Sequence, residues 1–140
     1  GYPDVHPSCP DGQTDLLNLK RKIDAGAQLV ITQLFFNNAD YFKLTDSLAA
    51  MGSTVPVIPG IMPMTSATQI EKMSSMCGAK VPDSLSSALK AAATPEQGVR
   101  AGLDHAINQC RELKQRGVKG FHFYPLNKAE TIVPILEAIL

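Results

Sequence analysis

The chain of 140 residues lacks several features that direct a protein to a particular class. It contains no tryptophan and equal numbers of acidic and basic residues, 13 of each. Because the charge is balanced and no basic run stands out, nucleic acid is not expected as a partner. No apolar stretch is long enough to span a bilayer, and no segment resembles a signal peptide, so no membrane association is predicted.

Cysteine and histidine are equally sparse. Cys9, Cys77 and Cys110 are widely spaced, odd in number and free of any metal-binding spacing, which favours reduced thiols in a cytoplasmic protein. His6 has no clustered partner, so no metal site is expected. The chain has no starting methionine, and its opening at Gly1 suggests a piece cut from a longer protein.

Segments with strand and helix character alternate along the chain. Strands are predicted over residues 29–36, 55–61 and 120–126, and residues 1–7 resemble the end of a strand that enters a loop. Helices are predicted over residues 15–25, 39–51, 66–77, 82–92 and 95–116, followed by a last helix toward residue 140. Thr14 is the predicted N-cap of the first helix and Gly26 its stop, while Pro134 is expected to kink the last helix or delay its start.

Successive strand–helix units of this kind predict a parallel sheet with right-handed crossovers. A (β/α)8 barrel needs eight such units and about 250 residues, of which this chain supplies about half. An open doubly wound sheet would need no missing units, but no glycine-rich phosphate loop follows any strand. We therefore predict an α/β fold in which residues 1–140 form the C-terminal half of a TIM barrel, with about four strand–helix units and no second domain.

Gln33 interrupts the run 29–36, which is otherwise typical of a strand buried on both faces. A buried amide without hydrogen-bond partners costs about 1–3 kcal/mol, so partners are expected. They could come from a neighbouring strand or loop, which would make Gln33 a core residue. They could equally come from a ligand, because the active sites of such barrels lie at the carboxyl ends of the strands.

Other side chains suited to ligand binding also follow the predicted strands. They comprise Tyr2, Asp4, His6, Met62, Tyr124, Asn127 and Lys128. This set is aromatic and poor in carboxylates, so it suits a flat heteroaromatic ligand better than metal-assisted hydrolysis. On the first helix, Asp15, Asn18 and Lys22 share one face with Arg21 beside it. The stripe is either a solvated face or a site for a long cofactor whose polyol binds the Asp and Asn and whose phosphates bind the cations.

Six motifs in this order and spacing closely resemble the methylenetetrahydrofolate reductase family, and together they cover essentially the whole chain. The motifs are GYPDVHP from residue 1, DLLNLKRK from 15, AGA from 25, ITQLFF from 31, PGIMP from 59 and HFYPLN from 122. The resemblance implies an FAD-dependent TIM-barrel oxidoreductase of one-carbon metabolism and methionine biosynthesis. Its reaction would be the reduction of 5,10-methylenetetrahydrofolate to 5-methyltetrahydrofolate by NAD(P)H, and the complete protein would be a homo-oligomer.

The resemblance also implies roles for individual residues. Those implied to bind FAD are Tyr2, His6, Asp15, Asn18, Arg21, Lys22 and Ile31. Those implied to contact the folate and the nicotinamide in turn are Gln33, Met73, Tyr124, Leu126 and Lys128. The family often has Arg where Lys128 stands, and Lys retains the charge without the planar fork of Arg.

The family's general acid lies on earlier strands that this chain lacks. The 140-residue chain alone is therefore expected to have no reductase activity. Two other functions stay open. The chain could be a non-catalytic module that binds flavin or another ligand, or it could belong to a different barrel enzyme of folate or flavin chemistry. The closely spaced segment from His6 to Lys22 argues against the latter. The sequence does not distinguish NADH from NADPH.

Overall fold

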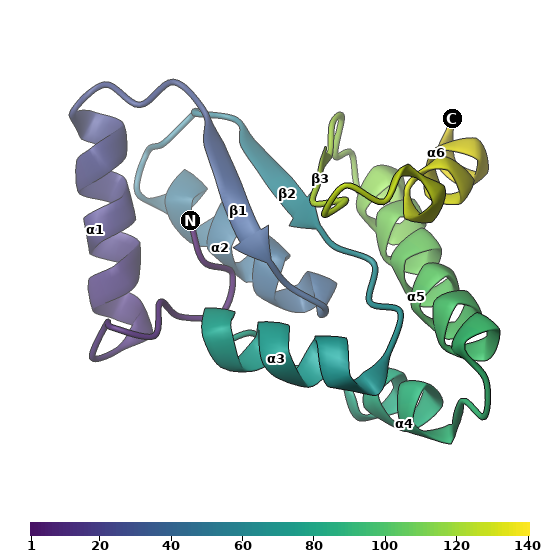
Figure 1. The fold of residues 1–140 in the computed structure, drawn as a ribbon. Coiled ribbons are helices and arrows are strands. Elements are labelled where there is room, and N and C mark those ends of the chain that lie inside the picture. The colour runs from purple at the N-terminus through teal and green to yellow at the C-terminus, as the bar shows by residue number, and fades with distance from the viewer.

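The computed structural model describes all of residues 1–140 as an α/β fold (Figure 1). Its sheet contains β1 (Val30–Leu34), β2 (Val57–Ile61) and β3 (His122–Phe123), in that order. The helices are α1 (Gly12–Asp24), α2 (Asn38–Ala50), α3 (Ala67–Cys77), α4 (Asp83–Ala91), α5 (Pro95–Gln115) and α6 (Val133–Ile139), with a short 3-10 turn, η1 (Ala129–Thr131), before α6. Figure 1 shows α3 lying across the end to which the β1 arrow points.

All strand pairings are parallel, as predicted. Val30 pairs with Val57 at the start of β1, and Gly60 pairs with His122 between β2 and β3. The register shifts between Ile31 and Leu34. At this irregularity the Gly60 N–H donates to the Thr32 hydroxyl over 2.8 Å, which replaces a backbone ladder bond. The predicted α/β class with a parallel sheet is therefore confirmed.

Gly1 occupies a fourth position in the sheet, beside β1. Its amino group donates to the Ile31 carbonyl over 2.9 Å, and its own carbonyl accepts from the Gln33 N–H over 2.6 Å. Bonds to two residues on either side of Thr32 are the pattern of a parallel ladder. Residues 1–7 thus begin beside the sheet and leave it as a loop, in agreement with the sequence-based expectation.

The burial of β1 differs from the expected strand buried on both faces. Val30, Thr32 and Leu34 are at most 4% exposed, because α1, α2 and the segments after β2 cover that face. On the alternate face Ile31 is 40% exposed and Gln33 is half-buried. The prediction that both faces of this strand are buried was wrong, because an apolar run shows only that both faces can be covered and not that they are. No element of this chain covers the second face of β1.

Several boundaries differ from their predictions by one to three residues, and two of these differences have a clear physical reason. The N-cap of α1 is Asp11, not Thr14: an Asp11 carboxylate oxygen accepts from the Thr14 N–H over 2.7 Å, and a charged cap also benefits from the helix dipole. The predicted strand 120–126 is shorter: β3 spans only His122–Phe123, and after Pro125 the chain reaches Leu126 and Asn127, which have φ values of 48° and 63°. A left-handed backbone cannot continue a strand, so the chain turns there.

The helix signal supplied by Pro134 is confirmed, and a second proline lies at the start of α5. Thr94 caps α5 through its hydroxyl, which accepts from the Gln97 N–H, and Pro95 lies in the first turn. Pro134 lies in the first turn of α6, which therefore starts only after η1. No helix of the structure is both long enough and apolar enough to cross a membrane.

Candidate functional site

The loop that follows Gly1 brings three of the predicted cofactor residues together. The rings of Tyr2 and His6 meet edge to face with centroids 4.6 Å apart. The His6 N–H donates to a carboxylate oxygen of Asp15 over 2.9 Å, which fixes the loop to the first turn of α1. The Ser8 N–H donates to His6 Nδ1 over 3.0 Å, which holds the ring in place within the loop.

The other predicted cofactor residues continue along α1. Asn18 accepts from an Arg21 guanidinium nitrogen over 3.1 Å, which orients both side chains on one face. Arg21 and Lys22 lie exposed in the last turn of the helix. With a rise of about 1.5 Å per residue, the stripe from Asp15 to Lys22 extends about 10 Å along the helix axis.

Gln33 lies on the open face of β1, at the carboxyl end of the strand. Its side-chain oxygen accepts from the Leu34 N–H over 2.9 Å, so the amide is satisfied locally rather than by another strand. The side-chain NH2 donates to no group of this chain. Gly1 connects this residue to the Tyr2 loop, because its backbone bonds both Ile31 and Gln33. The side-chain amide of Gln33 is therefore held in place by its oxygen, while its NH2 group remains able to donate a hydrogen bond to another molecule.

Tyr124 directly follows β3, and its side chain reaches across β2 to β1. Its hydroxyl donates to the Thr32 carbonyl over 3.0 Å, and burial raises its pKa. The ring passes over Gly60, where an added Cβ would be 2.8 Å from Tyr124 Cε2 and 2.4 Å from the Thr32 carbonyl oxygen. Only glycine fits at this crossing. Tyr124 and Met73 of α3 both pack against the buried cluster that contains Leu34.

The remaining predicted substrate residues follow Tyr124. Leu126 and Lys128 line a small hollow of about 50 Å³ next to it. Leu126 is 56% exposed and keeps the left-handed φ of 48°, although a bulky residue there costs about 1–3 kcal/mol. The structure thus forms two groups, one around the Tyr2 loop and α1, the other around Tyr124 and Met73. Gln33 is joined to the first group through Gly1.

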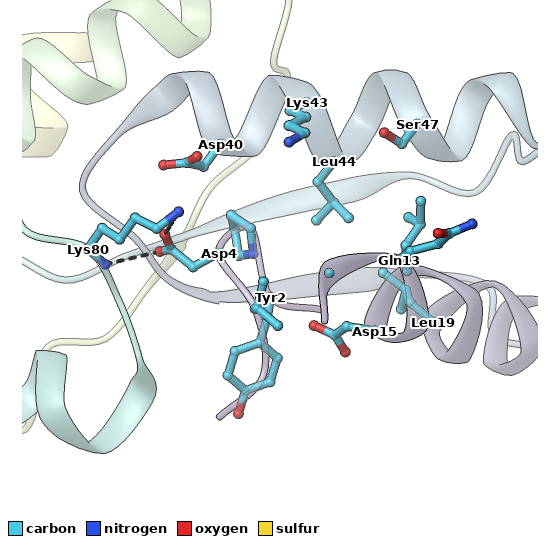
Figure 2. Close-up of a pocket in the computed structure, with 14 residues that line it drawn as sticks. Tyr2, Asp4, Gln13, Asp15, Leu19, Asp40, Lys43, Leu44, Ser47 and Lys80 are labelled. Carbon is cyan, nitrogen blue, oxygen red and sulfur yellow. Dashed lines mark hydrogen bonds and ion pairs between the residues drawn. The ribbon is translucent and has the colours of Figure 1, made fainter. Parts of the chain in front are cut away.

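A pocket of about 460 Å³ lies between the Tyr2 loop, α1 and α2 (Figure 2). Of the predicted site residues only Tyr2 and Asp15 line it, while the rest of the α1 stripe does not. Asp4 also lines it, with a side chain that is only 5% exposed. Burial, the largest cause, raises the pKa of this carboxyl, while a hydrogen bond from the Lys80 N–H opposes the shift. Sequence reasoning had placed Asp4 near the strand ends without a role.

The fold is that of an α/β protein with a parallel sheet, and an aromatic pair, an amide and a charged helix stripe lie on its first helix, its first strand and the loop between Gly1 and that helix. Proteins of this class commonly bind a ligand at the carboxyl edge of the sheet. Comparison with known families is more specific. Residues 1–140 match the family described as "Methylenetetrahydrofolate reductase". The chain belongs to the methylenetetrahydrofolate reductase family.

Several curated relatives support this membership. The chain is 40% identical over 139 residues to the 5,10-methylenetetrahydrofolate reductase of Pectobacterium carotovorum and 38% identical over 139 residues to that of Escherichia coli, covering 99% of this chain and 47% of each relative. It is 34% identical to "Methylenetetrahydrofolate reductase (NADH) 1" of Zea mays, covering 97% of this chain and 25% of that protein. The chain spans about half the length of the bacterial relatives it matches.

A solved structure with a related fold comes from Clostridium thermocellum. It superposes with a TM-score of 0.58 at 18% identity, over 91% of this chain and 47% of that one. That protein is described as uncharacterized and as binding two copies of 5-methyl-5,6,7,8-tetrahydrofolic acid. At this identity the likeness shows the fold alone.

Proposed function

We propose that this chain is the C-terminal half of a (β/α)8 barrel that catalyses the FAD-dependent reduction of 5,10-methylenetetrahydrofolate to 5-methyltetrahydrofolate by NAD(P)H. The names of its relatives support the reaction, and their length supports the half-barrel. Residues 1–140 would then be one half of a single catalytic domain. The sheet agrees with about four strand–helix units, because Gly1 takes the position before β1.

The observation that carries this proposal is the open face of β1. Leu29 and Ile31 are 51% and 40% exposed on the same side of the strand as Gln33. In a closed barrel such side chains would face the interior, which is filled by layers of residues from alternate strands. The amide of Gln33 would then stand at the mouth of the barrel. Enzymes of this fold bind their substrates at this end of the barrel.

The residues on α1 and the Tyr2 loop fit FAD. The exposed cations Arg21 and Lys22 could bind its pyrophosphate, and Asn18 and the second carboxylate oxygen of Asp15 could bind polyol hydroxyls. Tyr2 and His6 would add aromatic surface beside Ile31, close to the flavin ring. When bound, FAD would supply the hydride carrier between the nicotinamide and the folate.

Gln33 and the second group of residues, around Tyr124 and Met73, would hold the two substrates in turn. Gln33 can both donate and accept, so one side chain could bind either the pterin or the nicotinamide amide. Met73 and Tyr124 supply apolar surface, with the Tyr124 ring fixed by its bond to Thr32. Leu126 would extend that surface, and the exposed Lys128 could bind a carboxylate or a phosphate.

The protein would act in the cytoplasm, in one-carbon metabolism and methionine biosynthesis, as a homo-oligomer when complete. Cys77 and Cys110 support a reducing compartment, because both are buried free thiols. By resemblance, the general acid belongs to the other half of the barrel. The 140-residue chain should therefore show no turnover by itself, even with added FAD.

The test uses the full-length protein that contains this chain and its Gln33→Leu variant. We expect the variant to retain FAD, because Gln33 belongs to β1 and is not one of the α1 residues proposed to bind the polyol and pyrophosphate, but to slow both flavin reduction and reoxidation in stopped-flow measurements. The loss of one ligand hydrogen bond should cost about 1–3 kcal/mol, which would lower each rate by roughly 5- to 150-fold. Gln115→Leu, at an exposed position at the end of α5, is the matched control. Normal rates in Gln33→Leu would remove this residue from the site, and a full-length protein without flavin or turnover would refute the function.

A further inference from the structure

We infer that Asp4 is a positioning residue that fastens the cofactor loop (residues 1–7) to the α3–α4 turn (residues 78–82). The cofactor loop carries Tyr2 and His6, and α3 carries Met73. The connection would hold the flavin-facing and folate-facing parts of the site in one fixed relation. The inference rests on the proposed function for its catalytic consequences but on the geometry for the connection itself.

The first contact is made by the Asp4 carboxylate. One of its oxygens accepts from the Lys80 backbone N–H over 3.3 Å, across 76 residues of sequence. The other oxygen is buried, makes no hydrogen bond and lies 3.7 Å from the Lys80 ammonium. Figure 2 shows Asp4 directed toward Lys80, with both interactions drawn as dashed lines.

The backbone of Lys80 is the more important partner. The Lys80 side chain is 73% exposed, and an ion pair with so exposed a cation contributes little. The Asp4 side chain is 5% exposed, and its hydrogen bond to the Lys80 N–H, although it lies at the surface, joins a charged acceptor to a backbone group whose position the turn fixes. The connection therefore depends on an acceptor at position 4 rather than on the charge of Lys80.

A second contact joins the same two segments. Gly78 ends α3 with a left-handed φ of 68°, and it lies against the cofactor loop. An added Cβ would stand 3.2 Å from Pro7 Cγ and 3.4 Å from the Val5 carbonyl oxygen. The loop and the turn are therefore packed together as well as hydrogen-bonded.

The α3–α4 turn is itself rigidly connected to the substrate side. Cys77 and Ala79 are buried in the cluster that contains Leu34 and against which Met73 and Tyr124 pack. The cofactor loop is anchored independently through Gly1 and through His6. Asp4 thus links two anchored units, which also pack against each other at Gly78.

The test uses the full-length protein loaded with FAD. Asp4→Ala removes the acceptor and should increase both the FAD dissociation rate and the KM for the folate by about tenfold, with kcat at saturation within about twofold. Asp4→Asn keeps an acceptor at the same place and should restore both values to within about twofold of wild type. Lys80→Met keeps the backbone N–H and should also behave as wild type. A tenfold loss in Lys80→Met, an equal loss in Asp4→Asn, or no change in Asp4→Ala would overturn the inference.

A second measurement needs neither catalysis nor a folded Asp4→Ala variant. In the unsubstituted protein, the Lys80 amide should exchange with deuterium at least about tenfold more slowly than an unbonded amide. Rapid exchange at Lys80 would overturn the connection. If Lys80 is protected but the full-length protein neither binds FAD nor turns over, the proposed function fails while the connection stands.

Discussion

The close approach of α5 to the loop after β2 predicts a large effect of a single methyl group. A Cβ added at Gly102 would lie 1.4 Å from the Met64 carbonyl oxygen, and that contact must open to at least 3.0 Å. At Gly98, one turn earlier, the corresponding distance to the Thr65 carbonyl oxygen is 2.5 Å. Both obstacles are backbone atoms, so rotation of a side chain cannot relieve them.

The required shift of α5 would damage the core. The helix contributes Ala106, Cys110 and Leu113 to the cluster around Phe35, and each is at most 2% exposed. Overpacking costs about 1–3 kcal/mol and occasionally more. Because the added Cβ would lie only 1.4 Å from the Met64 carbonyl oxygen, we expect the cost of Gly102→Ala to lie at or above the upper end of this range. Replacement of a helical glycine by alanine would otherwise gain about 1 kcal/mol. We expect Gly102→Ala to lose about 2–3 kcal/mol net, a large part of the stability of a small domain.

Urea denaturation monitored by circular dichroism measures this decrease in the free energy of unfolding. Gly120→Ala is the matched control, because its φ is not left-handed and the nearest atom to an added Cβ is the Ile58 Cδ1, 3.8 Å away. Gly98→Ala should fall between the two variants. If Gly102→Ala proved as stable as Gly120→Ala, the packing of α5 against Met64 would be wrong as described.

Three further outcomes follow from the same structure. Leu126→Asn should raise the free energy of unfolding by about 1 kcal/mol, because Asn tolerates the φ of 48° and Leu126 is 56% exposed; a loss of stability would contradict the strained turn. Burial raises the pKa of Cys110 to about 12, so iodoacetamide at pH 8 should label the half-buried Cys9 in the native protein and leave Cys110 intact, as mass spectrometry of peptides can show. Burial raises the pKa of Asp4 above 3.8, so the folded state binds the proton of this carboxyl more tightly than the unfolded state does. The wild-type protein should therefore lose stability relative to Asp4→Asn as the pH rises above 3.8. Stability curves of the two proteins that run parallel over this pH range would contradict this expectation.

Local chemistry is what the sequence by itself determined. The alternation of apolar runs and amphipathic segments predicted the order of strands and helices, and Gly26 and Pro134 lie at helix ends as predicted. These features depend on backbone preferences within a few residues, which do not need the rest of the fold. Membership of the family was also recognisable from the ordered motifs.

Tertiary structure decided what each side chain touches. The exposure of Ile31 depends on whether an element covers that face of β1, and the apolar run carries no such information. The bonds from Tyr124 to Thr32 and from Lys80 to Asp4 join residues 92 and 76 positions apart, which no local pattern encodes. Strand direction and helix packing bring these groups within hydrogen-bond distance, and burial then shifts the pKa values of Tyr124 and Asp4.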